Sequence, residues 1–119
     1  MLLIREAQMD QFRREVREQF IDRASRTVAA HWPAVARDTA PAGLRALVAR
    51  ALAAGEMLGF LTETQALRFV NLTVALGEGF ETQPRCSWAR PILTNTALSP
   101  DSKLDLLFAR ARSALLEQA

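Results

Sequence analysis

The segment from Thr62 to Gly77, TETQALRFVNLTVALG, constrains the fold more than any other part of the chain. Thr62 and Gln65 have the spacing of a capping box, which predicts the start of a helix. Gly77 is typical of a residue that ends one, because glycine adopts a positive φ at little cost. The apolar residues between these ends lie on more than one side of the helix, and such a helix is usually buried. The sequence therefore predicts a central helix that other helices enclose.

Amphipathic segments on both sides of this helix are its expected partners. Residues 5–31 predict a long helix whose apolar stripe is expected to be buried against the central one. The stripe consists of Met9, Phe12, Val16, Phe20, Ala24 and Val28. A second helix is expected to begin at Pro41 and to end at Gly59. A last helix is expected to follow Ser99, a good cap, with Pro100 at its first position.

Two shorter segments connect these helices. Residues 31–41, HWPAVARDTAP, predict a connector with one short helical turn from residue 34 to residue 38. Residues 85–98, RCSWARPILTNTAL, predict a short helix or two turns broken near Pro91. Strand patterns, repeats and interdomain linkers are absent from the sequence. We therefore expect an all-α fold, with residues 1–119 forming a small single-domain helical bundle of about four main helices plus one or two short ones.

The composition of the chain argues against several classes of protein. The net charge is +2 and no part of the chain is strongly basic, whereas nucleic-acid binders usually carry a one-sided basic field. No run reaches the roughly 18 apolar residues of a membrane span, and the apolar start is too short for a secretory signal. Cys86 is the only cysteine, which excludes an internal disulfide and suits a reducing compartment. We expect a cytoplasmic protein without nucleic-acid or membrane partners.

Residues able to carry chemistry are few. His31 and Cys86 are the only histidine and cysteine, too few for a structural zinc site. The carboxylates Glu78 and Glu81 fall on an expected exposed loop, where the separated pKa values of general acid–base catalysis do not arise. We predict no catalytic residue, no cofactor and no metal. Two alternatives stay open, which are a hydrolase or transferase using Cys86 with His31, and nucleic-acid binding through the arginines of the first helix.

The glycine-rich stretch LGEGF, residues 76–80, is interpreted as a helix end. A phosphate cradle needs glycines that lead into a helix N-terminus, where backbone amides attract anions. Here the glycines follow a C-terminus, and Glu78 adds a negative charge. Gly77 is therefore expected to be a cap, and Phe80 is expected to fold back onto the core.

Three aromatic residues in the connectors are the best candidates for contacts with a partner. Trp32, Phe80 and Trp88 all lie outside the helix stripes. Such residues more often cover the end of a core, but tryptophan dominates many binding hot spots. We assign all three as candidate partner-binding residues.

The chain also resembles a known group of proteins. The run MLLIREAQMDQFRREVREQF, followed by HWP, LTETQALRFVNLTVALGEGF and KLDLL, is similar to small helical accessory proteins encoded in bacterial type VI secretion effector clusters. The resemblance implies a non-enzymatic co-chaperone or adaptor for an effector or its loading chaperone. Its partner would be an effector, an adaptor chaperone or a spike protein. The alternative is an immunity protein that neutralises a cognate toxin, and a homo-oligomer is left open.

Overall fold

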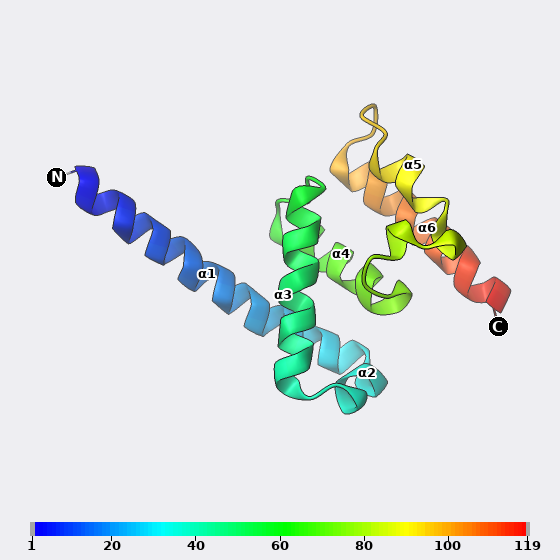
Figure 1. Cartoon of the computed structure of the whole chain (residues 1–119), viewed down its shortest axis with the longest axis horizontal. Helices are drawn as coiled ribbons and strands as arrows, with labels where there is room; N and C mark the ends of the chain where they lie inside the picture. Colours follow the sequence, from blue (N-terminus) through cyan, green and yellow to red (C-terminus); the bar gives the residue numbers. More distant parts are fainter. Residues whose placement is uncertain (1, 119) are drawn as a thin grey trace. The chain divides into compact units, whose positions relative to one another are not determined.

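The computed structural model describes the backbone of residues 2–118 and the side chains of residues 8–116. Over this range the chain is all-α, as expected, with four long helices and two short ones and with no strand. The helices are α1 (Leu2–His31), α2 (Pro33–Asp38), α3 (Pro41–Met57), α4 (Glu63–Leu76), α5 (Ala89–Leu93) and α6 (Pro100–Gln118), with 3₁₀ turns η1 (Phe80–Thr82) and η2 (Pro84–Cys86) (Figure 1).

Internal contacts divide the chain into two compact units. The N-terminal unit is Met1–Ala49 and the C-terminal unit is Arg50–Ala119, so the boundary falls within α3. The expectation of one domain over residues 1–119 stays a prediction, and each unit is described by itself.

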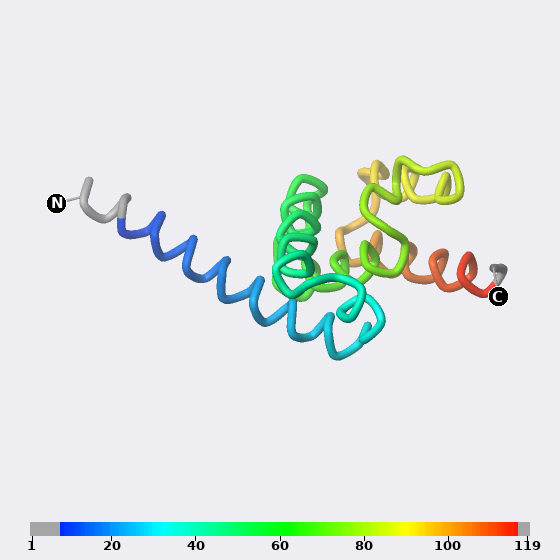
Figure 2. Tube along the Cα trace, turned by 60° about the horizontal axis from the view of Figure 1, so that its bottom comes forward, coloured from blue at the N-terminus to red at the C-terminus, as the bar shows by residue number. Residues whose placement is uncertain are grey.

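The N-terminal unit begins with the long helix α1. This helix ends at His31, since Trp32 leaves the helical region with φ −129° and Pro33 starts α2. The short helix α2 packs against α1, and the chain then turns into α3 (Figure 2). The expected helical turn in this connector is confirmed, with α2 running over Pro33–Asp38.

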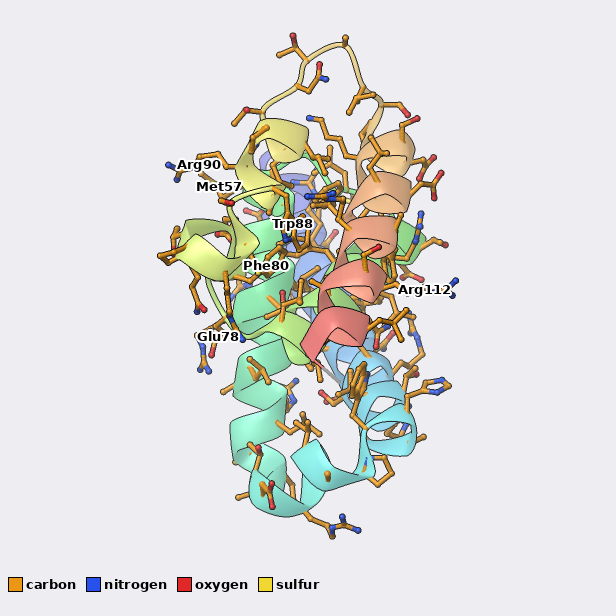
Figure 3. All side chains as sticks on the ribbon, turned by 90° about the vertical axis from the view of Figure 1, so that its right-hand side faces the viewer. Met57, Glu78, Phe80, Trp88, Arg90 and Arg112 are labelled. Carbon is orange, nitrogen blue, oxygen red and sulfur yellow. The ribbon has the colours of Figure 1, made fainter. Side chains whose placement is uncertain are left out.

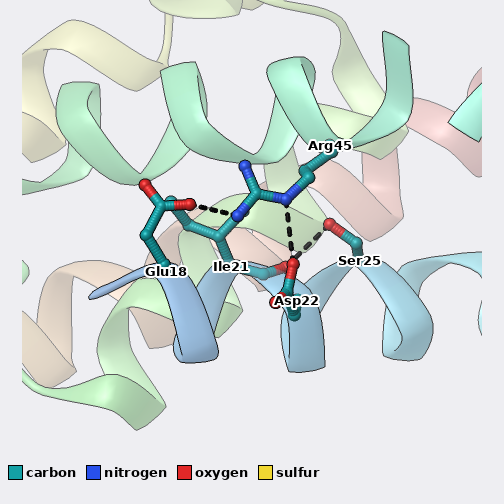
Figure 4. A network of polar contacts seen from close by, with 5 residues as sticks. All are labelled: Glu18, Ile21, Asp22, Ser25 and Arg45. Atoms are coloured by element: carbon teal, nitrogen blue, oxygen red, sulfur yellow. Dashed lines mark hydrogen bonds and ion pairs between the residues drawn. The ribbon is translucent and has the colours of Figure 1, made fainter. Parts of the chain in front are cut away.

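An arginine joins α3 to the middle of α1. Arg45 donates hydrogen bonds to Asp22, at 2.9 Å, and to Glu18 (Figure 4). Around this ion-pair network, apolar residues of both helices are buried. These are Phe20, Ile21, Ala24 and Val28 of α1 and Leu44 and Val48 of α3. The second half of the stripe on α1 therefore belongs to the core.

The first half of the apolar stripe on α1 does not belong to the core. Met9, Phe12 and Val16 are 47%, 58% and 39% exposed, so the expectation that the whole stripe is buried is wrong. Rotation around the helix does not explain the difference, because the exposed Met9 and the buried Phe20 point within about 20° of each other. The reason is the extent of cover along α1: Arg45 of α3 meets α1 at Glu18 and Asp22, and the buried residues of α1 begin at Phe20.

The C-terminal unit is built around α4 and α6, which pack against each other. Its buried cluster consists of Phe60, Phe69, Leu72, Leu76, Phe80, Cys86, Ala89, Leu93, Leu104, Leu107 and Ala111. Three phenylalanine rings meet at its centre, with centroids 5.3 Å apart for Phe60–Phe69 and 5.8 Å apart for Phe69–Phe80. Gly55 lets α3 approach this group, since an added Cβ would lie 3.1 Å from the Phe69 ring. The wide buried face expected for α4 is confirmed within the C-terminal unit, whereas its central position among all the helices stays a prediction.

The capping residues expected at the ends of α4 and α6 are found there in the structure. Thr62 and Gln65 form the expected capping box, and Gly77 ends α4 with φ 99°. Ser99 accepts a hydrogen bond from the amide of Ser102 at the start of α6. The helix α5 runs through Pro91 where a break was expected. Pro91 lies in the first turn of α5, where an amide has no acceptor within the helix, and so it interrupts nothing.

Candidate functional site

The glycine-rich loop after α4 has the geometry of a helix cap. The amide of Gly77 donates to the Thr73 carbonyl at 2.8 Å, and Arg85 donates to the Leu76 carbonyl. Glu78 accepts two hydrogen bonds from Arg50, at 2.9 and 2.8 Å. These hydrogen bonds, opposed by partial burial, lower the pKa of Glu78. The interpretation of Gly77 as a helix cap is confirmed. The carboxylate of Glu78, the next residue, is held by Arg50.

Phe80 is part of the core of the C-terminal unit. None of its surface is exposed, and its ring lies against Phe69. Gly79, with φ 68°, supplies the left-handed backbone that turns the chain inward before it. The expectation that Phe80 folds back onto the core is confirmed. A partner could touch Phe80 only if this core opened.

The two tryptophans are half-buried. Trp88 precedes α5 and packs against the core cluster, and the Arg110 guanidinium lies 6.0 Å from its ring centroid. In Figure 3, Trp88 and Phe80 are labelled near the middle of the view, whereas Arg90 and Arg112 point outward. Trp32 lies at the junction of α1 and α2, where its amide donates to the Val28 carbonyl at 2.7 Å. Their partner-binding roles stay predictions.

Cys86 and His31, the candidate nucleophile and its candidate base, belong to different units of the chain. Cys86 is 2% exposed within the core of the C-terminal unit, where a substrate cannot reach its sulfur. His31 is an exposed residue at the end of α1. Among the described side chains, no group of three His, Cys, Asp or Glu residues could hold a metal ion.

The feature that sequence reasoning missed is the exposed half of the α1 stripe. Met9, Phe12 and Val16 follow one another at spacings of three and four residues, which places them on one side of two successive turns. All three are exposed, Phe12 most of all at 58%. Contiguous exposed apolar residues with a polar rim are typical of interaction sites. We refer to these three residues as the exposed stripe.

Polar residues of opposite character border the exposed stripe. At about 100° per residue, Arg13 and Arg17 fall on one flank, and Gln8, Glu15 and Gln19 fall on the other. Arg13 lies 3.6 Å from Asp10, and Gln11 donates to Glu15 at 3.3 Å. Beyond the second flank is an open depression of about 720 Å³, lined by Gln11, Arg14, Glu15, Glu18 and Gln19. The stripe is thus an apolar strip between a basic flank and an amide-rich, acidic one.

Phe108, Met57 and Leu61 are also exposed and apolar, but they do not form a regular stripe with one another. Phe108 on α6 is 36% exposed, but the Arg68 guanidinium lies 5.0 Å from its ring centroid, and Arg68 also binds Asp105 at 2.8 Å. Met57 and Leu61, near the turn between α3 and α4, are 88% and 75% exposed. They do not share one helix face, so they lack the regular spacing of the exposed stripe.

Comparison with protein-family models, curated proteins and solved structures finds no match for this chain. None of the helices, over the residues described, combines the length and the apolar character needed to cross a membrane. The interpretation of the exposed stripe therefore depends on its own residues.

Proposed function

We propose that the protein is a non-enzymatic, protein-binding accessory of the co-chaperone or adaptor kind, and that it binds through the exposed stripe of α1. The observation that carries the proposal is the exposure of Phe12, flanked along the helix by Met9 and Val16. Anchors at positions i, i+3 and i+7 are typical of a helix that places its apolar face in a groove of a partner. Met9, Phe12 and Val16 have this spacing.

The aromatic anchor supplies the main driving force for such binding. Large aromatic side chains dominate interface energies, and hot-spot residues contribute about 2 kcal/mol or more when a partner buries them fully. Phe12 is the largest side chain of the exposed stripe and has the most surface left to bury. Arginines on one flank would then fix the orientation of the partner, because their planar guanidinium groups favour paired contacts at interfaces.

The resemblance to proteins of type VI secretion effector clusters supports a choice of partner. We infer that the stripe binds an effector, the adaptor chaperone that loads it, or a spike protein. Effectors are loaded inside the producing cell, and the accessory would accordingly act in the cytoplasm. Neither a cofactor nor a metal enters this function.

Affinity capture from the native host tests the proposal. Wild type is expected to recover an effector, an adaptor chaperone or a spike protein, and Phe12→Asp is expected to lose it. Leu61→Asp is the matched control, since Leu61 is also exposed and apolar, at 75%, but lies in the C-terminal unit. Recovery of none of these proteins, together with normal effector export in a deletion strain, would exclude the proposed function.

The same capture separates the two roles considered for the protein. A recovered toxin whose activity is blocked by wild type would identify an immunity protein. Reduced loading or export of a recovered effector in the deletion strain would support the adaptor role.

A further inference from the structure

Among the described residues of α1, the side that carries the exposed stripe also carries arginines and no carboxylate. At about 100° per residue, Arg13, Arg23 and Arg26 lie within about 75° of the centre of the stripe. All three side chains are exposed. The nearest carboxylate in this part of α1 is that of Glu15, about 90° away, and the others lie farther around the helix. The surface around the stripe is therefore basic.

The carboxylates on the other sides of α1 have partners of their own. Glu18 and Asp22 accept hydrogen bonds from Arg45 of α3, at 2.9 Å for Asp22. Asp22 lies four residues before Arg26, a spacing at which the two side chains could otherwise pair. Because Arg45 holds Asp22, the guanidinium of Arg26 is available to another protein.

The other two arginines lie in line with the stripe and beside it. Arg23 lies within about 15° of the centre of the stripe, about two turns beyond Val16, and its guanidinium lies 5.9 Å from the ring centroid of Phe20. Arg13 lies 3.6 Å from Asp10, and both of these side chains are about two-thirds or more exposed. Exposed ion pairs contribute little to stability. Arg13 can therefore exchange Asp10 for a carboxylate of a partner at little cost.

The apolar part of the stripe is small, so a partner must also contact the residues around it. Three side chains about half exposed offer on the order of 300 Å² of apolar surface, less than half of the about 800 Å² per partner in a standard interface. We infer that the protein bound by the exposed stripe presents an apolar groove whose rim carries carboxylates, and that these contact Arg13, Arg23 and Arg26. Guanidinium groups pair with carboxylates through two parallel hydrogen bonds. The inference rests on the proposed function, because it describes the partner that the stripe binds.

Such charges make the binding sensitive to salt. Complementary charges at the rim of an interface steer the two proteins together and raise the association rate. Salt screens this attraction, since the Debye length falls from about 10 Å at 0.1 M to about 3 Å at 1 M. Wild type is therefore expected to capture its partner less well as salt increases.

Carbodiimide cross-linking tests for the carboxylates directly. A carbodiimide joins a lysine amine to a carboxylate only where the two groups are in contact. The chain has a single lysine, Lys103, which lies in the C-terminal unit, so the wild-type chain measures the background. Arg23→Lys and Arg26→Lys, incubated in extract of the native host, are each expected to form an adduct with the effector, adaptor chaperone or spike protein that wild type captures. Mass spectrometry is expected to place the new amide at an aspartate or glutamate of that protein.

The matched control is Arg14→Lys, because Arg14 lies about 165° around the helix from the centre of the stripe. An equal adduct yield from Arg14→Lys would overturn the inference, as would yields at the wild-type background from both Arg23→Lys and Arg26→Lys.

Charge reversal gives a second, independent measurement. A chain with both Arg23→Glu and Arg26→Glu is expected to bind the captured protein at least about tenfold more weakly at low salt, whereas Arg14→Glu is expected to bind like wild type. Equal binding by the two variants would overturn the inference. So would loss of capture on nuclease treatment, because the arginines would then bind the phosphates of a nucleic acid.

The inference and the proposed function fail in different ways. Capture that is lost on Phe12→Asp but unchanged by reversal of both arginines would remove the acidic rim and leave the proposed function. Capture that survives Phe12→Asp would remove the proposed binding surface, whatever the arginine variants do.

Discussion

Replacing Phe80 by alanine is expected to destabilise the C-terminal unit severely. The side chain is fully buried, and its ring centroid lies 5.8 Å from that of Phe69 at the centre of the core cluster. Removing a buried phenylalanine costs about 3–5 kcal/mol, because transfer free energy is lost and a cavity remains. The fixed turn at Gly79, with φ 68°, limits how far the loop can collapse into that cavity. We therefore expect a loss in the upper half of this range.

This loss translates into a large change in melting temperature. For a unit of this length, each kcal/mol lowers Tm by roughly 4–8 °C, so a loss of about 4 kcal/mol or more for Phe80→Ala should lower it by about 16 °C or more. Far-UV circular dichroism during urea and thermal denaturation measures the change in the free energy of unfolding. The matched control is Phe12→Ala, which removes the same atoms from a side chain that is 58% exposed. It is expected to stay within about 0.5 kcal/mol of wild type.

The comparison would refute the reasoning if the two substitutions had similar effects. A small loss for Phe80→Ala would mean that the loop after α4 does not place this ring in a close-packed core. A large loss for Phe12→Ala would mean that the stripe is covered within the folded chain, and it could then not serve as a free binding surface.

Three further outcomes follow from the C-terminal unit. Gly77→Ala should lower the free energy of unfolding by about 1 kcal/mol or more, because an alanine at φ 99° is strained and its Cβ would lie 3.4 Å from Arg85. An unchanged midpoint of urea denaturation would contradict the role of Gly77 as a cap. The pKa of Glu78 is lowered by Arg50, so its small stabilising contribution is present above the unfolded pKa of about 4.3 and is lost as pH falls through the lower folded value. Glu78→Gln should remove this part of the acid dependence, and identical pH profiles would contradict the pairing. Cys86 should react with iodoacetamide more slowly than free cysteine in the native protein and at the ordinary rate in urea, whereas rapid native reaction would revive a catalytic thiol.

Features governed by a few neighbouring residues could be predicted from the sequence. The capping box of α4 depends on Thr62 and Gln65, and its end depends on the positive φ of Gly77. The start of α6 depends in the same way on Ser99. The inward turn of Phe80 was also predictable, because burying a phenylalanine removes a large apolar area from water. Each of these signals lies within one turn of the structure it specifies.

Burial that depends on packing between helices far apart in sequence could not be predicted in the same way. The repeat along α1 looks continuous in sequence, yet Phe20 is buried and Phe12 is exposed. A helical wheel places Met9 and Phe20 within about 20° of each other, so the spacing carries no signal of where along α1 the cover by α3 begins. The passage of α5 through Pro91 depends on where that helix begins, which the sequence does not mark with a cap. For the tryptophans, the half-burial of Trp88 depends on its packing against the core and on Arg110, which lies far away in sequence.

The central claim is that the exposed stripe of α1 binds protein, and a photo-cross-linking scan tests it most directly. A photoreactive amino acid is placed at each position from Gln8 to Gln19 in turn, and adducts are quantified in the native host. The account predicts a helical period in adduct yield, with maxima at Met9, Phe12 and Val16 and a minimum at Arg14 on the opposite side. The absence of adducts, or equal yields around the helix, would contradict it.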